Sequence, residues 1–314
     1  MLKDKTIIFP HKPGYGGPGS FQKRINHEII NNNGKIKYEY EQNNNNLVFI
    51  VGGTRRLLWL LKLKIKKIPI VYRLDGLNWI HKKDNNYNFL ISEIQNLIMN
   101  IIRKFFATYI VYQSKFVKDW WETKGWRTNK ENFIIYNGVN LDNFSPKNRY
   151  SQTNLIDLLI VEGTIDYSPY AINLLNDLQE KLIENSNYRS IKLYGRFKDK
   201  KNIDKLSPMI NYEGFVDVDN IANVYNNAVY LSLDVNAACP NTVIESLSSG
   251  IPVIGYDTGS LSELVDPLCG VVCSYGGDAW NLDYPNVDNL VESALKVLDD
   301  WGEYSKNARY IFNN

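Results

Sequence analysis

Cysteine and histidine are scarce in this chain of 314 residues. The three cysteines, Cys239, Cys269 and Cys273, are few and odd in number, which indicates a reducing compartment and no disulfide framework. Cys269 and Cys273 have no second pair and no nearby histidine, so a zinc site is not expected. Three histidines leave little room for a Ser-His-Asp or Cys-His catalytic set, and the sequence contains no Gly-x-x-x-x-Gly-Lys-Ser/Thr phosphate loop.

Long apolar runs are also missing. No stretch of about 18 uninterrupted apolar residues occurs, so no transmembrane helix is expected. The first residues, MLKDKTIIFPHKPGYGG, are too short and too polar to form a signal peptide. Together with the low cysteine content, these features predict a cytoplasmic protein.

Acidic residues are scarce in the first half of the chain only. Residues 1–150 hold 25 Lys and Arg against 11 Asp and Glu, a net charge of +14. Residues 151–314 hold 11 against 23, a net charge of −12. The length and the charge split predict two domains, 1–150 and 151–314, with different partners and a linker at Ser151 to Asn154.

The stretch from Val229 to Val265 is typical of a strand–helix–strand unit. VYLSLD is an apolar run that suits a buried parallel strand, and a turn of small residues follows it. Asn241 or Thr242 is expected to cap a helix that starts near Val243.

The start of this helix is the strongest candidate for a ligand site. Free backbone N–H groups at a helix N-terminus attract phosphate. Glu245 lies one turn inside the helix, where it can accept hydrogen bonds from ligand hydroxyls. The alternative is a helix of any α/β domain, with Glu245 solvated.

Two further strand ends carry polar or glycine-rich turns. Residues 11–20, HKPGYGGPGS, separate a short strand from a helix expected over Phe21 to Asn31, and the alternative is a merely structural loop. A strand over 69–74 ends in Arg73-Leu-Asp75-Gly76, where open α/β sheets bind ligands. Asp75 could instead bond its own backbone in a simple turn.

Two helical segments have distinct surface chemistry. Residues 55–67, RRLLWLLKLKIKK, predict a cationic amphipathic helix that suits an anionic bilayer surface. The alternative is a helix that faces the core and has a solvated basic side. Val287 to Phe312 is expected to be helical, and its last turns could pack back on the first domain.

PNTVIESLSSGIPVIGYDTGSLSELV, residues 240–265, resembles the donor-binding signature of family 4 of the retaining glycosyltransferases, the glycosyl transferases group 1. The resemblance implies the α/β fold called GT-B, in which two doubly wound, Rossmann-like domains face each other across a cleft. It implies that the first domain binds the acceptor and the second a sugar nucleotide. The implied reaction transfers a hexose, with retention, from a UDP- or GDP-linked sugar to a glycan or lipid-linked acceptor, without a metal or a cofactor.

The resemblance also assigns residues to roles. It places the ribose at Glu245, the diphosphate at Asn241 and Thr242, and the sugar or acceptor at Asp75. The donor-binding positions that it implies are Arg73, Gly163, Thr164, Arg196, Gly214, Phe215, Pro240, Asn241, Thr242 and Glu245. Gly16 and Gly17 are implied to line the cleft near the donor phosphate and the acceptor, and together with Asp75 they are the implied catalytic positions.

The chain departs from the family pattern at three positions. Ala237 stands where many members have a first glutamate, and Thr164 and Tyr170 stand where many have an Arg and Lys clamp on the diphosphate. The cation for the diphosphate is therefore expected to be Arg73 or Arg196.

Two other functions stay open. A GT-B sugar-nucleotide epimerase would convert the donor without an acceptor, and a non-catalytic protein would only bind it. The partners expected are a nucleotide sugar, its acceptor and a peripheral membrane contact through the basic half, with no nucleic acid.

Overall fold

A computed structural model describes residues 5–14, 16–41, 46–83, 89–124, 126–146, 155–217 and 220–313. The chain forms two compact units, residues 1–137 and 138–314. The linker predicted at Ser151 to Asn154 lies outside the described residues.

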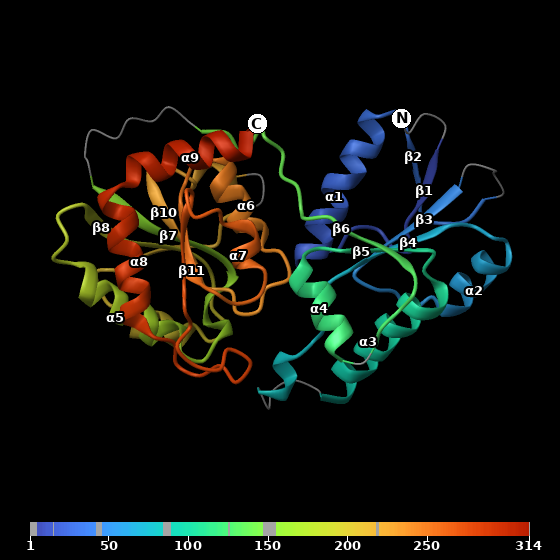
Figure 1. The fold of residues 1–314 in the computed structure, drawn as a ribbon, viewed down its shortest axis with the longest axis horizontal. Coiled ribbons are helices and arrows are strands. Elements are labelled where there is room, and N and C mark those ends of the chain that lie inside the picture. Colours follow the sequence, from blue (N-terminus) through green and yellow to red (C-terminus); the bar gives the residue numbers. More distant parts are fainter. Residues whose placement is uncertain are drawn as a thin grey trace. The chain divides into compact units, whose positions relative to one another are not determined.

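The first unit is built on a parallel sheet of six strands in the order β2-β1-β3-β4-β5-β6 (Figure 1). Its strands are β1 (Thr6–Ile8), β2 (Lys35–Lys37), β3 (Asn46–Val51), β4 (Ile70–Leu74), β5 (Tyr109–Tyr112) and β6 (Glu131–Ile134). Valine and isoleucine dominate the central strands, as expected of strands that are buried on both faces.

Helices connect most of these parallel strands, as in a doubly wound fold. They are α1 (Gly16–Asn31), α2 (Leu57–Ile65), η1 (Ile80–Lys82), α3 (Phe89–Ile101), the π-helix η2 (Ile102–Phe106) and α4 (Lys115–Thr123). Ile29 of α1 packs with Ile7 and Phe9, while α2 buries Leu60 and Leu63 and packs against η2. Helix α1 begins five residues before the predicted Phe21, because a first turn tolerates proline and glycine.

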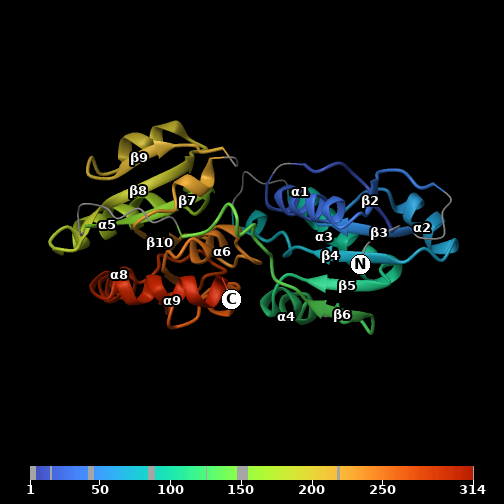
Figure 2. The same ribbon diagram turned by 90° about the horizontal axis from the view of Figure 1, so that it is seen from above.

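The second unit has its own parallel sheet, in the order β12-β11-β10-β7-β8-β9. Figure 2 labels its strands β9, β8, β7 and β10. The strands are β7 (Ile156–Thr164), β8 (Tyr188–Arg196), β9 (Asn211–Gly214), β10 (Ala228–Ser232), β11 (Val253–Tyr256) and β12 (Gly270–Cys273). This is the strand order of the nucleotide-binding Rossmann fold, with β7 as its first strand.

Helices cover both faces of this second sheet. They are α5 (Ala171–Leu182), α6 (Asn241–Ser248), α7 (Leu261–Leu264), α8 (Val287–Asp299) and α9 (Trp301–Asn313), with 3-10 turns η3 (Ile165–Tyr167), η4 (Lys200–Lys205) and η5 (Ile221–Asn223). Apolar residues of α5 and α8 form one buried cluster with the strands, and those of α6, α7 and α9 form a second.

The helical tail differs from the single helix predicted over Val287 to Phe312. It breaks at Asp300, whose φ of −113° and ψ of 27° are not helical, and continues as α9. Helix α9 packs on α6, where Ser305 donates a hydrogen bond to the Gly250 carbonyl at 2.7 Å. None of the helices within the described ranges combines the length and the apolar character needed to cross a bilayer.

Candidate functional site

The strand orders define where each unit can bind a ligand. In a doubly wound sheet, ligands bind beyond the carboxyl ends of the strands, at the point where the strand order reverses. That point lies between β7 and β10 in the second unit and between β1 and β3 in the first. The two candidate half-sites are therefore the loops that follow these pairs of strands.

Helix α6 begins at the switch point of the second unit. It starts at Asn241 after Pro240, which has φ −66° and ψ 120°, and no side-chain acceptor caps it. The prediction that Asn241 or Thr242 caps the helix is therefore wrong, because both residues already belong to its first turn. Backbone N–H groups at the start of a helix are the donors that bind anions, and the Pro240 side chain does not compete for them.

Glu245 lies one turn inside α6 and is only 3% exposed. Its Oε2 accepts a hydrogen bond from the Tyr225 hydroxyl at 3.2 Å. Burial and the Glu245 charge raise the pKa of Tyr225 well above its ordinary value, so this tyrosine remains a donor. The carboxylate is thus held in one orientation, and the solvated Glu245 of the alternative interpretation does not occur.

The loop before α6 is held by the loop after β11. The Thr258 hydroxyl accepts a hydrogen bond from the Asn236 N–H at 3.3 Å, and the Ala237 carbonyl accepts one from the Ser260 N–H at 3.0 Å. Gly259 has a φ of +64°, and a Cβ there would lie 2.4 Å from the Ala237 nitrogen. Glycine is therefore required for the two loops to approach this closely.

The other predicted donor residues lie at the carboxyl ends of β7, β8 and β9. Thr164 of β7 is paired in register with Arg196 of β8, and Gly163 is exposed. The Arg196 guanidinium carbon lies 3.8 Å from the centre of the Phe215 ring, which is 47% exposed and follows Gly214. The structure thus brings a cation and an aromatic face together at this edge.

An acidic pair, Glu162 and Asp234, was not predicted as a site. Glu162 lies in β7, and Asp234 comes two residues after the end of the adjacent strand β10. Burial first and the Asp234 charge second raise the pKa of Glu162 well above its ordinary value, although the Leu233 N–H donates to it. Glu162 Oε1 is buried and has no hydrogen-bond partner in the part of the chain that the structure describes. The apolar runs around both residues gave no signal of this pairing.

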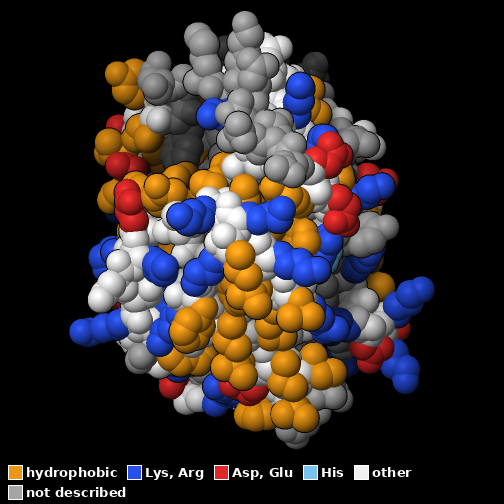
Figure 3. Space-filling view, turned by 90° about the vertical axis from the view of Figure 1, so that its right-hand side faces the viewer, with side chains coloured by type: hydrophobic (Ala, Val, Ile, Leu, Met, Phe, Trp, Pro, Cys, Tyr) orange, Lys and Arg blue, Asp and Glu red, His pale blue; other side chains and the backbone are white. Residues whose placement is uncertain are grey.

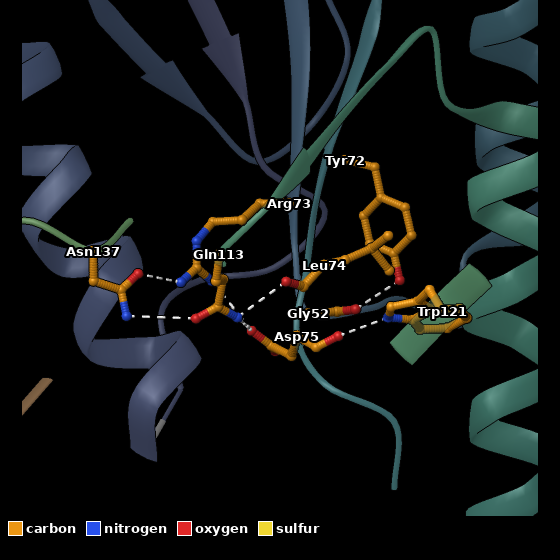
Figure 4. Close-up of polar contacts among 8 residues, drawn as sticks. All are labelled: Gly52, Tyr72, Arg73, Leu74, Asp75, Gln113, Trp121 and Asn137. Atoms are coloured by element: carbon orange, nitrogen blue, oxygen red, sulfur yellow. Dashed lines mark hydrogen bonds and ion pairs between the residues drawn. The ribbon is translucent and has the colours of Figure 1, made fainter. Parts of the chain in front are cut away.

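In the first unit, Arg73 and Asp75 stand in one polar network at the ends of β4 and β5 (Figure 4). Arg73 Nη1 donates to Asp75 Oδ1 at 3.1 Å, and Arg73 Nη2 donates to Asn137 Oδ1. The Arg73 guanidinium carbon lies 3.7 Å from the centre of the Phe21 ring, and the residue is only 2% exposed. Arg73 is therefore directed into the unit and engaged by its own neighbours.

Asp75 is fixed by several donors and a close glycine. Gln113 Nε2 donates to its Oδ1, and Trp121 Nε1 donates to its backbone carbonyl at 3.0 Å (Figure 4). A Cβ on Gly52, whose φ is +72°, would lie 2.7 Å from Asp75 Oδ2. Burial raises the pKa of the Asp75 carboxyl, and the Arg73 charge and the Gln113 hydrogen bond oppose that rise.

The glycine loop lies at the switch point of the first unit. Gly16, with φ +77°, and Gly17 begin α1, and a Cβ on either would meet nothing within 4 Å. The His11 Nε2 and Thr54 Oγ1 atoms are 2.8 Å apart, which ties this loop to the loop after β3. Burial and the Arg56 charge lower the pKa of His11. Sequence reasoning gave no role to His11, Gln113 or Asn137, because their partners come from distant strands.

No metal site emerges from the residues described. Within those ranges, His, Cys, Asp and Glu side chains form no group of three or more that could hold a metal ion.

Two parallel six-stranded sheets, each with polar residues at its carboxyl edge, define the GT-B fold, and the fold predicted from the sequence is confirmed. Comparison with protein-family profiles found no match, and neither did comparison with curated protein sequences. Solved structures do match, over nearly the whole chain.

Three of these structures illustrate the likeness. A sucrose-phosphate synthase from Thermosynechococcus elongatus has a TM-score of 0.71 at 12% identity, covering 98% of this chain and 94% of that chain. HepE from Anabaena, in complex with UDP-glucose, has a TM-score of 0.65 at 13% identity over the same shares. A glycosyltransferase from Rickettsia africae has a TM-score of 0.65 at 17% identity, covering 99% and 93%. At these identities the likeness establishes the fold.

Proposed function

We propose that this protein is a retaining glycosyltransferase that moves a hexose from a UDP- or GDP-linked donor to a glycan or lipid-linked acceptor, without a metal. The observation that carries the proposal is α6: its first turn has no side-chain cap, and the buried Glu245 lies one turn behind. Backbone N–H groups suit a diphosphate, and a carboxylate suits the two hydroxyls of a ribose. The fold likeness to HepE, whose structure contains UDP-glucose, supports the same ligand class.

The proposed chemistry rests on positioning and electrostatics. In a retaining transfer on one face of the sugar, the bond from the anomeric carbon to the diphosphate oxygen breaks as the bond to the acceptor oxygen forms. The leaving diphosphate takes the proton of the acceptor hydroxyl. Amide donors at the start of α6 would stabilise the charge that develops on this diphosphate, and electrostatic stabilisation of this kind is usually the largest single contribution to catalysis.

Arg196 is the better of the two proposed cations for the diphosphate. It is exposed at the end of β8, whereas Arg73 is buried and bonded to Asp75 and Asn137. Gly163, Thr164, Gly214 and Phe215 share its edge of the sheet and complete the proposed donor site. In the first unit we assign Asp75, Gly16 and Gly17 to the sugar and the acceptor.

Calorimetry with free nucleotides tests the donor site. Glu245→Gln should weaken binding of the preferred nucleoside diphosphate by about 1.5–3 kcal/mol, because a charge-assisted hydrogen bond is lost. Glu263→Gln, an acidic residue of the neighbouring helix α7, is the matched control and should leave the affinity unchanged. Unchanged affinity in Glu245→Gln would remove the ribose role.

A second titration tests the cation. Arg196→Ala should reduce affinity for UDP or GDP at least tenfold and leave affinity for the nucleoside unchanged, since only the phosphates are lost as partners. Lys198→Ala changes a nearby exposed cation and should have little effect. Equal losses for nucleoside and diphosphate would contradict a diphosphate contact.

Product analysis tests the reaction. NMR of the product with a donor and a glycan acceptor should show the same anomeric configuration in donor and product. An inverted product refutes retention, conversion of the donor without an acceptor identifies an epimerase, and tight binding without turnover across donor and acceptor panels identifies a binding protein.

A further inference from the structure

Helix α3 buries mainly polar side chains and exposes apolar ones, the reverse of the usual distribution. Its buried residues are Ser92, Asn96, Met99 and Asn100, so three of the four are polar. Leu90, Ile94 and Leu97, which recur on the opposite side, are 67%, 46% and 53% exposed. A water-facing helix normally shows the opposite pattern.

Specific hydrogen bonds fix this orientation. Asn96 Oδ1 accepts from the Asn78 N–H and Asn96 Nδ2 donates to the Asn78 carbonyl, both at 2.9 Å. The Asn78 side chain donates to Gln95 at 3.2 Å. A rotation of α3 that buried the leucines would break all three hydrogen bonds. These bonds therefore keep the apolar face of α3 directed outward.

Neighbouring segments extend the apolar surface. Helix α2 buries Leu60 and Leu63 but leaves Leu58, Leu61 and Ile65 at 78%, 46% and 73% exposure. Phe105 of η2, which joins α3 and packs on α2, is 60% exposed. We define the α2–α3 patch as Leu58, Leu61, Ile65, Ile94, Leu97 and Phe105.

Basic side chains surround the α2–α3 patch. Figure 3 shows hydrophobic side chains gathered on this face, with Lys and Arg side chains around them. Exposed lysines of and after α2 are Lys62, Lys64, Lys66 and Lys67. The one acidic residue in the sequence of α2, α3 and η2 is Glu93, which is engaged by His81 and Lys82. The α2–α3 patch is therefore an exposed apolar surface surrounded by a net positive charge.

We propose that the α2–α3 patch docks the protein on an anionic phospholipid bilayer. Exposed leucine, isoleucine and phenylalanine side chains suit the boundary between headgroups and acyl chains, and the lysines suit anionic headgroups. A second copy of the chain fits less well, because a two-fold interface through this face would bring two basic rims together. The proposal is independent of the donor site, since it needs no nucleotide sugar.

Vesicle flotation tests the docking. The full-length protein should float with vesicles of phosphatidylcholine and phosphatidylglycerol and stay behind with phosphatidylcholine alone. Each lysine near an anionic surface contributes about fivefold to the binding constant, so replacing Lys62, Lys64, Lys66 and Lys67 with Gln should reduce binding by about 600-fold. Salt of about 1 M should act likewise, because the Debye length falls to about 3 Å.

Apolar variants separate insertion from simple charge attraction. Leu58→Ser, Ile65→Ser and Leu97→Ser combined should reduce flotation at least tenfold without changing the urea midpoint, because these side chains are exposed. The matched controls replace exposed residues of the second unit: Ile183→Ser, Met209→Ser and Leu268→Ser for the apolar set, and Lys200→Gln, Lys201→Gln, Lys296→Gln and Lys306→Gln for the lysines.

The outcomes are decisive in both directions. Loss of flotation in the two patch variants, with both control variants unchanged, supports the bilayer surface. Wild-type protein that stays soluble with anionic vesicles at low salt refutes it. A wild-type dimer that the apolar variant converts to monomer also refutes it, because the patch would then be covered by a second copy.

Discussion

Replacement of Arg73 by methionine tests whether this residue holds the first unit together or holds a ligand. The side chain is 2% exposed and donates to Asp75 Oδ1 and Asn137 Oδ1. Methionine keeps much of the volume and can still contact Phe21, but it leaves Asp75 without its cation. The expected result is a loss of stability with little change in nucleotide affinity.

The size of the loss follows from the burial of the pair. Removing one partner of a buried ion pair costs about 3–5 kcal/mol, because the remaining charge stays desolvated. The Asp75 side chain is 26% exposed, so we expect about 3 kcal/mol, the low end of that range. At a urea dependence of roughly 1–3 kcal/mol per M, the midpoint should fall by about 1–3 M.

The pH dependence carries a definite sign. The pKa of Asp75 is already raised by burial, and losing Arg73 removes a charge that opposes the rise. A carboxyl group whose pKa is higher in the folded than in the unfolded protein destabilises the folded state when it is charged, at a pH above that raised pKa. The destabilisation disappears when the group is protonated. The deficit of Arg73→Met should therefore shrink as the pH falls through the raised pKa of Asp75.

Tryptophan fluorescence during urea unfolding is the assay. Five of the seven tryptophans lie within residues 1–137, so the signal reports mainly the first unit. The control is Arg73→Met combined with Asp75→Asn, which should recover at least about 1 kcal/mol because no unpaired charge remains. An unchanged midpoint with a tenfold loss of diphosphate affinity would refute the structural role and assign Arg73 to the donor.

Three further predictions concern buried features of both units. Glu162→Gln should stabilise the protein by about 1–3 kcal/mol near pH 8, because an unpartnered charged oxygen is removed. Calorimetric unfolding should show this gain in stability shrinking as the pH falls, and a gain that stays constant would contradict the raised pKa of Glu162. Gly259→Ala should weaken nucleotide binding in calorimetry, because its Cβ would push on the Ala237 backbone; unchanged affinity would show that the loop before α6 tolerates the shift. Asn96→Ala should speed hydrogen exchange at the Asn78 amide, and unchanged protection would mean that this bond does not hold the loop.

The elements of the half-site in the second unit were predictable because their signals are local. The apolar run, the small-residue turn and Glu245 lie within one strand–helix–strand unit, so chain order alone places them together. The cap was predicted wrongly because Asn241 and Thr242 favour that position, yet Pro240, with its fixed φ, precedes the helix. Residue preferences therefore predicted that a helix forms here but not that it begins at Asn241.

The first half-site was less predictable because its contacts are not local. Arg73 looked like a free cation at a strand end, and nothing near it in the sequence reveals that Asn137, sixty-four residues later, accepts its hydrogen bond. The Gln113 amide donates to Asp75 from the end of the adjacent strand β5, and nothing near Gln113 in the sequence reveals this contact. Side chains that face each other over parallel strands leave no periodic trace in one sequence.

The reversed helix α3 links the proposed membrane surface to the first half-site within one unit. Its outer side carries the apolar face, and its inner side holds the backbone of Asn78, three residues after Asp75. Gly76 in between is packed so closely that a Cβ would lie 2.7 Å from the Trp120 ring, and Trp121 donates to the Asp75 carbonyl. The turn that carries Asp75 is therefore held on both sides, by α4 and by α3.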